Sequence, residues 1–148
     1  MTRRARVTPV AARARVFEYA VTIDPDWNVV GDRGGTPLQG SEEEAWTPEH
    51  LLIAGLGRCT LTSLRHHCGR SGIGLTSQAT ATGTVTRRES DGRFALVEAE
   101  VSLDVSLDPL PDAEAVAALL AKAERDCFVG ASLAVAPTYR WTVNGVAR

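Results

Sequence analysis

The sequence predicts an α+β fold in which antiparallel sheets pack against one long central helix. Two observations carry this prediction. The stretch at 47–69 has the capping residues and the apolar content of a single long helix. Strand-like and helix-like patterns come in runs along the chain instead of alternating one by one. Such runs favour α+β over a doubly wound parallel fold.

The chain before the long helix is predicted to contain a tail, short strands and a loop. Residues 1–14 are basic and rich in alanine, and we expect an N-terminal tail followed by a single domain at 15–148. Alternation predicts a strand at 16–23, and turn signals separate it from two further short strands, at 27–30 and 36–39. Three consecutive glutamates predict a solvated acidic loop at 40–45.

The long helix has clear start and stop signals. Thr47 is a suitable N-cap, because its hydroxyl can accept a free backbone N–H, and Pro48 follows at the first helical position, where its missing donor costs nothing. Glu49 in the first turn suits the positive end of the helix dipole. Residues 51–56 are apolar nearly all the way round, and Gly55 and Gly57 allow another backbone to approach. We therefore expect a central helix rather than a surface helix.

The chain after the long helix is predicted to contain three strands and two helices. Alternation indicates strands at 75–87 and 94–107, and Ser-Asp-Gly at 90–92 is typical of the turn of a hairpin. An apolar stripe predicts a helix at 112–125, formed by Val116, Leu119, Leu120 and Ala123. A short helix to about residue 133 and a last strand at 138–143 complete the chain.

Composition argues against several classes of partner. The 148 residues have a formal net charge of -2, which disfavours nucleic acid and anionic membrane surfaces as partners. We see no apolar run near the ~20 residues that a membrane helix needs, and no apolar signal-peptide core after the N-terminal arginines. We therefore expect a cytoplasmic protein that binds neither nucleic acid nor membrane.

Three cysteines are the candidates for chemistry, and an odd number does not form a structural disulfide framework. Cys59 lies inside the apolar helix, whereas Cys127 lies at a predicted helix start, where a thiolate gains from the helix dipole. Cys59 therefore needs a cation to become a nucleophile. Because Lys122 is the only lysine, that cation should be an arginine held by a carboxylate. The alternative is a free cysteine that acts as a small core hydrophobe.

Two motifs resemble those of the OsmC/Ohr family. The residues TPEHLLIAGLGRC at 47–59 resemble the family's helix start, Pro-Glu-x-Leu-Leu, which leads to a cysteine ten residues after the glutamate. The residues AERDCFVGASL at 123–133 resemble the family's second cysteine site, a cysteine that opens a helix. The order of the predicted elements also matches, so the resemblance covers roughly 16–145.

The resemblance implies a thiol peroxidase that reduces organic hydroperoxides. By this resemblance Cys59 is the peroxidatic cysteine and Cys127 is the resolving cysteine, which condenses with the sulfenic acid to a disulfide. A dithiol reductant, often a lipoyl group in the family, then restores both thiols. Glu49 matches the carboxylate that orients an arginine toward the thiolate. The family fold implies an intertwined homodimer.

Two features depart from the family pattern. Phe128 follows the second cysteine, where the family often has proline. The family's arginine comes from a loop before the long helix, where this sequence aligns poorly. Arg33, in a glycine-rich turn, is our first choice, and Arg13 and Arg15 are the alternatives.

The histidines and the third cysteine do not indicate a metal site. His66 and His67 are adjacent, so on a helix they point about 100° apart and do not face one ion easily. No partner at zinc-ligand spacing accompanies them. We expect no metal and no cofactor, interpret these histidines and His50 as surface or interface residues, and interpret Cys68 as a bystander thiol.

The distance along the helix predicts a site shared between two chains. Glu49 and Cys59 are ten residues apart, or about 15 Å along the helix axis. Two such helices packed antiparallel across a two-fold axis bring Glu49 of one chain toward Cys59 of the other. The alternatives to a peroxidase are an OsmC-like protein that binds a small apolar or electrophilic ligand or senses redox state without turnover, and a purely structural dimer.

Overall fold

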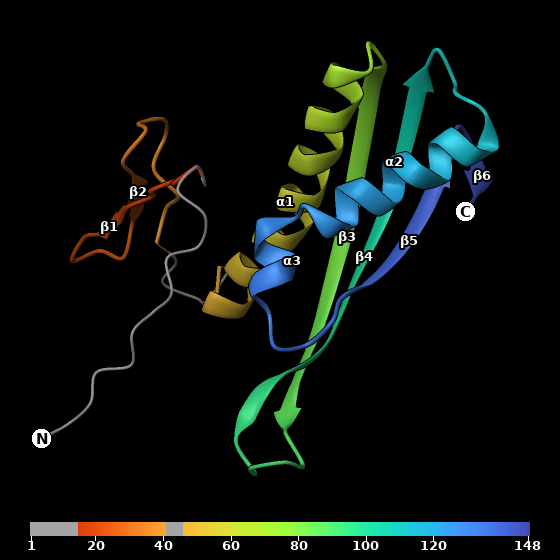
Figure 1. Cartoon of the computed structure of the whole chain (residues 1–148). Coiled ribbons are helices and arrows are strands. Elements are labelled where there is room, and N and C mark those ends of the chain that lie inside the picture. The colour runs from red at the N-terminus through yellow and green to blue at the C-terminus, as the bar shows by residue number, and fades with distance from the viewer. Residues whose placement is uncertain (1–14, 41–45) are drawn as a thin grey trace, which may run out of the picture. The chain divides into compact units, whose positions relative to one another are not determined.

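The computed structural model describes residues 15–40 and 46–148 (Figure 1). The predicted tail at 1–14 and the residues 41–45 of the predicted acidic loop lie outside the described residues. The chain divides into two compact units, Met1–Ala45 and Trp46–Arg148. Within the described ranges, every helix is too short or too polar to cross a membrane.

The described part of the first unit is a small two-stranded antiparallel sheet of β1 (Val21–Ile23) and β2 (Val29–Gly31). Asp24 forms the turn between them, because its Oδ1 accepts the backbone N–H groups of Asp26 and Asn28, each at 2.9 Å. The first predicted strand is therefore shorter than alternation suggested. The third, at 36–39, is reduced to a single bridge between Leu38 and Val29.

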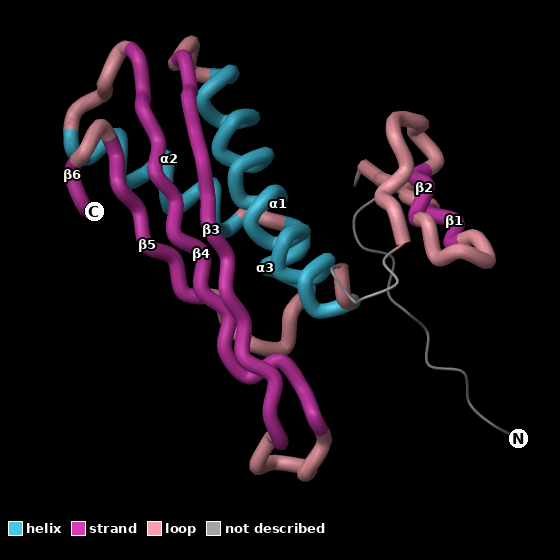
Figure 2. Tube along the Cα trace, turned by 180° about the vertical axis from the view of Figure 1, so that it is seen from behind, coloured by secondary structure: helices cyan, strands magenta, loops and turns pink. Residues whose placement is uncertain are grey.

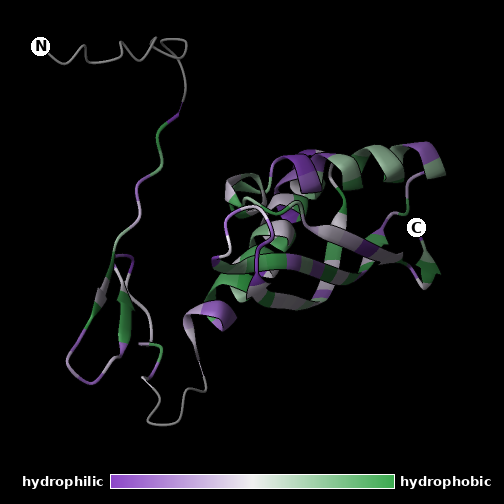
Figure 3. Ribbon diagram, turned by 90° about the horizontal axis from the view of Figure 1, so that it is seen from below, coloured by the Kyte–Doolittle hydropathy of each residue, from purple (hydrophilic) through white to green (hydrophobic). Residues whose placement is uncertain are grey.

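The strands of the first unit carry hydrophobic residues, as Figure 3 shows. Most large apolar side chains in residues 15–40 are exposed: Val16, Phe17, Tyr19, Val21, Ile23, Trp27 and Val30. A sheet of two short strands has no second layer in which to bury such side chains. Residues 15–40 of this unit therefore leave most of their large apolar side chains exposed.

Helix α1 (Pro48–Arg70) begins and ends close to the predicted residues. Thr47 Oγ1 accepts the backbone N–H of His50 at 3.3 Å, and His50 Nδ1 accepts the backbone N–H of Thr47 at 3.4 Å. This reciprocal capping box satisfies two free donors at the helix start. The core-facing side of the helix presents Leu56, Thr60, Ser63, Leu64 and Cys68, all buried.

Two long strands follow the helix and pair along their whole length. β3 (Gly74–Arg87) runs antiparallel to β4 (Phe94–Asp108), with an irregularity between Thr84 and Val85. The far end of this hairpin extends beyond the helices (Figure 1). β3 is an edge strand, because the sheet order is β3-β4-β5-β6, with β5 and β6 as defined below.

The remaining strands make the sheet a mixed one. β5 (Thr138–Val143) pairs with β4 in parallel, and β6 (Val146–Ala147) pairs with β5 antiparallel. The β4–β5 pair differs from the antiparallel arrangement that we expected. Helix α2 (Ala113–Arg125) and helix α3 (Phe128–Ser132) occupy the connection between β4 and β5. A connection of this kind carries the chain back to the starting end of the sheet, which makes the next strand parallel.

The helices lie together on one face of the sheet, and Figure 2 shows the opposite face, which carries none of them. The core forms between α1, α2 and β4. The predicted stripe of α2 is buried, as are the inward side chains of β4: Ala99, Val101, Leu103, Val105 and Leu107. The α+β fold with a long central helix is therefore confirmed.

Candidate functional site

The fold brings Cys59 and Cys127 together from distant parts of the sequence. Cys59 lies in the middle of α1 and is half-buried, whereas Cys127 is the N-cap of α3 and is fully buried in the core. The Cys127 thiol lies within hydrogen-bonding reach of Cys59 and raises its pKa. All three cysteines are free thiols in this structure.

The first turn of α3, which begins directly after Cys127, also faces Cys59. Burial is the largest influence on Cys59 and raises its pKa above the ordinary value. Hydrogen bonds from the backbone at Val129 and Phe128 act in the opposite direction and lower the pKa, because they favour the thiolate. These two donors come from α3, because the backbone N–H groups in the middle of α1 are already used within the helix.

These backbone contacts include the residue at which the sequence departs from its family pattern. Proline has no backbone N–H, so a proline at position 128 could not donate to Cys59. Phe128 retains that donor, and its backbone hydrogen bond lowers the pKa of Cys59. Sequence reasoning noted Phe128 but missed its role, because nothing local indicates that α3 opens toward α1.

The Cys127 thiol has its own set of polar neighbours. Its Sγ accepts the backbone N–H of Gly130 at 3.3 Å and lies 3.5 Å from the Thr60 hydroxyl. The Tyr139 hydroxyl approaches from β5, so closely that a Cβ built on Gly130 would lie 2.8 Å from it. Burial, and then Cys127, raise the pKa of Tyr139. Thr60 and Tyr139 carry no recognisable motif, and sequence reasoning missed both.

Cys68 lies apart from this thiol pair. It is fully buried in the core near the end of α1, and burial raises its pKa. His67 beside it contacts Asp126, with Nε2 and Oδ2 2.9 Å apart. Among residues 15–40 and 46–148, no group of three or more His, Cys, Asp or Glu side chains is arranged to hold a metal ion.

The predicted arginine and glutamate lie in different parts of the chain. Glu49 is exposed in the first turn of α1. Arg33 belongs to the first unit, where its guanidinium carbon lies 4.8 Å from the centroid of the Tyr19 ring. Arg15 is exposed, and Arg13 lies outside the described residues. The roles of Arg33 and Glu49 therefore stay predictions.

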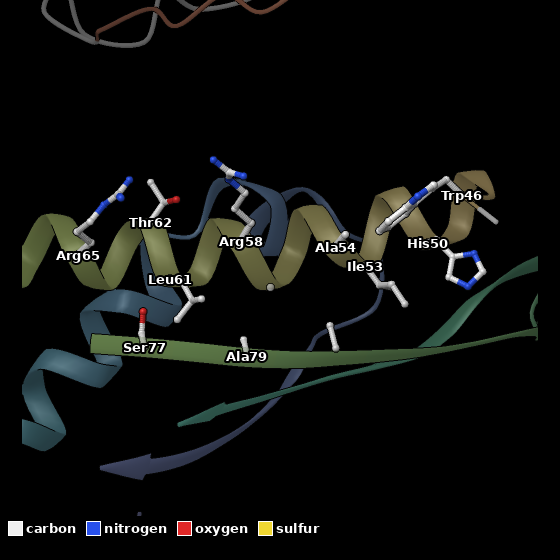
Figure 4. A pocket seen from close by; sticks show the side chains of 12 residues that line it. Trp46, His50, Ile53, Ala54, Arg58, Leu61, Thr62, Arg65, Ser77 and Ala79 are labelled. Carbon is white, nitrogen blue, oxygen red and sulfur yellow. The ribbon is translucent and has the colours of Figure 1, made fainter. Parts of the chain in front are cut away.

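A groove of about 580 Å³ lies on the side of α1 that faces away from Cys59. In Figure 4, Leu61 and Ile53 point from α1 toward β3, whereas Arg58 and Arg65 point away from that strand. Gly57 lies where α1 packs against β3, since a Cβ built on it would be 3.6 Å from Ala81 on β3. The groove is therefore separate from the thiol pair.

Comparison with solved structures identifies the fold. An OsmC-like protein of unknown function from Vibrio cholerae superposes with a TM-score of 0.68 at 12% identity, covering 86% of this chain and 100% of that chain. The organic hydroperoxide resistance protein OhrB of Bacillus subtilis gives a TM-score of 0.58 at 23% identity, covering 85% of this chain and 98% of that one. An organic hydroperoxide resistance protein from Legionella pneumophila gives 0.58 at 22% identity, covering 88% and 98%.

Comparison by sequence agrees with the fold. No curated protein matches the chain in sequence. The model of the OsmC-like protein family matches residues 40–142, a range that contains both cysteine motifs, the whole of α1 and the core of the sheet. The match covers well over half of the chain, and the chain therefore belongs to the OsmC-like protein family.

Proposed function

We propose that this protein is a thiol-dependent hydroperoxide reductase that prefers organic peroxides and uses Cys59 and Cys127 as a redox pair. The observation that carries the proposal is the position of half-exposed Cys59 beside buried Cys127, with backbone hydrogen bonds from 128 and 129 directed at Cys59. Similar structures from Bacillus subtilis and Legionella pneumophila are named organic hydroperoxide resistance proteins, which supports the same chemistry.

The difference in exposure supports one order of events. Cys59 is the more accessible thiol, so its thiolate meets the peroxide and attacks one oxygen of the O–O bond. That bond breaks, an alcohol leaves after it takes up a proton, and Cys59 becomes a sulfenic acid. The Cys127 thiolate then attacks the Cys59 sulfur, the S–O bond breaks, and hydroxide leaves as water. A dithiol, such as a lipoyl group on a protein, reduces the resulting disulfide by exchange.

The resting thiol still needs a positive charge. The groups that shift the pKa of Cys59 within the described residues include no arginine, and the net shift is upward. We propose that Arg33, held by Glu49 of a second chain, supplies the charge that lowers this pKa. Cytoplasmic reducing conditions would return all three thiols to the free state found here.

An intertwined homodimer would complete this site, and two surfaces support it. Leu51 and Leu52, in the first turns of α1, are 37% and 40% exposed, and a Cβ added at Gly55 meets no atom within 4 Å. The described part of the first unit, residues 15–40, exposes most of its large apolar side chains. Because Gly57 packs on β3 of its own chain, Gly55 is, of the two glycines near Cys59, the one available for close approach of a partner helix.

The second candidate function is a small-ligand-binding or redox-sensing protein without peroxidase turnover. The upward shift of the Cys59 pKa favours it, because a protonated thiol is a poor nucleophile toward peroxide. In this case Cys59 would react only with strong electrophiles, and the reduced protein would not consume peroxide catalytically.

Peroxide consumption with dihydrolipoamide as reductant separates the two functions, with cumene hydroperoxide and hydrogen peroxide compared. We expect turnover with both and faster turnover with cumene hydroperoxide. Cys59→Ser should abolish it, whereas Cys127→Ser should permit one turnover and leave Cys59 as a sulfenic acid that a dimedone probe labels. Wild-type protein that consumes neither peroxide, although its thiols are reduced, would support the second candidate instead.

A further inference from the structure

Three polar groups from three different elements converge on the buried sulfur of Cys127. The backbone N–H of Gly130 in α3 donates to it at 3.3 Å, and the hydroxyl of Thr60 on α1 lies 3.5 Å from it. The hydroxyl of Tyr139 on β5 lies close by, because a Cβ built on Gly130 would be 2.8 Å from this hydroxyl and 3.4 Å from Cys127 Sγ. Both Thr60 and Cys127 influence the pKa of Tyr139. This convergence occurs where Cys127 and Thr60 are each fully buried.

The two hydroxyls are costly to place here, which indicates a role beyond packing. Thr60 lies in the apolar stripe of α1, where its hydroxyl also donates to the Leu56 carbonyl at 3.0 Å. Its single proton can serve one acceptor at a time, so it can turn from the carbonyl to a charged sulfur. Glycine at position 130 leaves room for the Tyr139 hydroxyl, since a Cβ there would lie 2.8 Å from that oxygen.

We propose that Thr60 and Tyr139 are positioning residues for Cys127, whose hydroxyls donate to its sulfur whenever that sulfur carries negative charge. The inference rests on the proposed pairing of Cys59 with Cys127. The charge appears twice in the cycle: when the Cys127 thiolate attacks the Cys59 sulfenic acid, and when disulfide reduction releases it. Charge-assisted hydrogen bonds are about twice as strong as neutral ones, so the hydroxyls favour the thiolate in both steps.

A direction for disulfide reduction follows. In thiol–disulfide exchange the better-stabilised thiolate leaves faster, and the more accessible sulfur is attacked. Cys127 is fully buried, whereas Cys59 is half-exposed. The incoming reductant thiolate therefore forms its S–S bond with Cys59, the Cys59–Cys127 bond breaks, and Cys127 leaves with the electron pair. A second thiolate of the reductant then releases Cys59.

The first test titrates Cys127 without requiring peroxidase activity. Thiolate absorbance at 240 nm is followed against pH in Cys59→Ser protein, and the signal of Cys59→Ser/Cys127→Ser protein is subtracted to remove the Cys68 contribution. The ionisable groups around Cys127 in this background are Tyr139 on β5 and, next to Tyr139, Glu124 on α2. The tyrosinate signal is followed separately at 295 nm and subtracted, because Cys127 raises the pKa of Tyr139.

Removing either hydroxyl should raise the pH at which Cys127 ionises. Tyr139→Phe and Thr60→Val, each added to Cys59→Ser, should shift the titration upward by about one pH unit. Thr60→Ser retains the hydroxyl and should restore the original titration. Thr62→Val, at an exposed position of the same helix, is the matched control and should leave it unchanged. If Tyr139→Phe and Thr60→Val both titrate as the control does, the inference is wrong, whatever the peroxidase activity.

The second test maps the direction of reduction. The disulfide is prepared with diamide instead of peroxide, so that it forms even if the protein lacks peroxidase activity. Brief treatment with a monothiol, acid quenching and peptide mapping should then find the monothiol on Cys59. A mixed disulfide found mainly on Cys127 would overturn the assignment of Cys127 as the leaving thiolate.

Discussion

His67 on α1 and Asp126 at the end of α2 are joined by a partly buried contact of 2.9 Å between Nε2 and Oδ2. Asp126 immediately precedes Cys127, and its carboxylate also accepts two hydrogen bonds from Arg125, at 2.8 and 2.9 Å. This contact ties the C-terminal half of α1 to the residue that precedes the second thiol. It therefore couples the packing of α1 against α2 to the position of Cys127.

The first prediction concerns the pH dependence of this contact. The hydrogen bonds of Arg125, and then His67, lower the pKa of Asp126 from 3.8 to about 2. A carboxyl group whose folded-state pKa is lowered stabilises the fold above its unfolded pKa, and this contribution is lost as pH falls through the folded value. Asp126→Asn should therefore lower the melting temperature at pH 6, and the difference from wild type should disappear near pH 2. If the difference in melting temperature stayed the same from pH 6 to pH 2, the Asp126 carboxylate would not be the source of this stability.

The second prediction concerns which cysteines form the disulfide. Limited peroxide treatment should give an intramolecular Cys59–Cys127 disulfide and leave Cys68 as a free thiol, because Cys68 is fully buried away from the pair. Non-reducing peptide mapping after rapid alkylation measures the products. Finding Cys68 in the dominant disulfide would exclude this assignment.

The third prediction concerns the backbone donor at position 128. Phe128→Pro removes the N–H but suits the first position of α3, where proline is favoured. The Cys59 pKa should rise, so alkylation of Cys59 by iodoacetamide at pH 7 should slow. Phe128→Ala retains the N–H and is the matched control for the lost ring. Equal alkylation rates in the two variants would show that this N–H does not stabilise the thiolate.

The fourth prediction concerns the close packing at Gly130. An alanine Cβ there would lie 2.8 Å from the Tyr139 hydroxyl and 3.4 Å from Cys127 Sγ, so one of these groups must move. We expect Gly130→Ala to lower the free energy of unfolding by about 1–3 kcal/mol, as overpacking does elsewhere. Gly69→Ala is the control, because a Cβ there meets nothing within 4 Å. Urea unfolding measures the free energy of unfolding of both variants. Equal values for the two would contradict the prediction.

The fifth prediction concerns the shared site. Cys59→Ser and Glu49→Ala proteins should each be inactive or nearly so. After unfolding and refolding as a mixture, hybrid dimers should regain part of the peroxidase activity, because one of their two sites carries both intact groups. Each variant refolded alone is the control, and wild-type protein carried through the same cycle reports the refolding yield. Inactive mixtures beside well-refolded wild type would show that the groups act within one chain.

The elements with local signals could be predicted closely from the sequence. The start of α1 depends on Thr47 and Pro48, which act on their immediate neighbours, and the helix begins at the predicted residue. The first strand did not follow its pattern, because alternation describes side-chain faces and not the partner strand. Of the predicted range 16–23, Val21–Ile23 is the part that pairs as a strand. The parallel β4–β5 pair likewise depends on how α2 and α3 cross the sheet.

The candidate site was predictable only in part. The two motif cysteines could be found from the sequence, and the structure brings them together. Their surroundings could not, because Phe128 and Tyr139 reach the thiols through the packing of α3 and β5 against α1. No spacing in the sequence indicates that the backbone N–H groups after Cys127 are directed at Cys59. The role of Arg33 stays a prediction, because no arginine is among the groups of the described residues that shift the pKa of Cys59.

The position of Cys59 and Cys68 on the same helix has a consequence during folding. In an unfolded chain, Cys59 and Cys68 are only nine residues apart, whereas Cys127 is many times farther along the sequence. Loop-closure entropy in that unfolded chain favours the short pairing by about 2 kcal/mol. Folded α1 then holds Cys59 and Cys68 about 13 Å apart along its axis, which no disulfide can span. Premature oxidation would thus lock the nascent chain out of its longest helix, and reducing conditions during synthesis protect the fold itself.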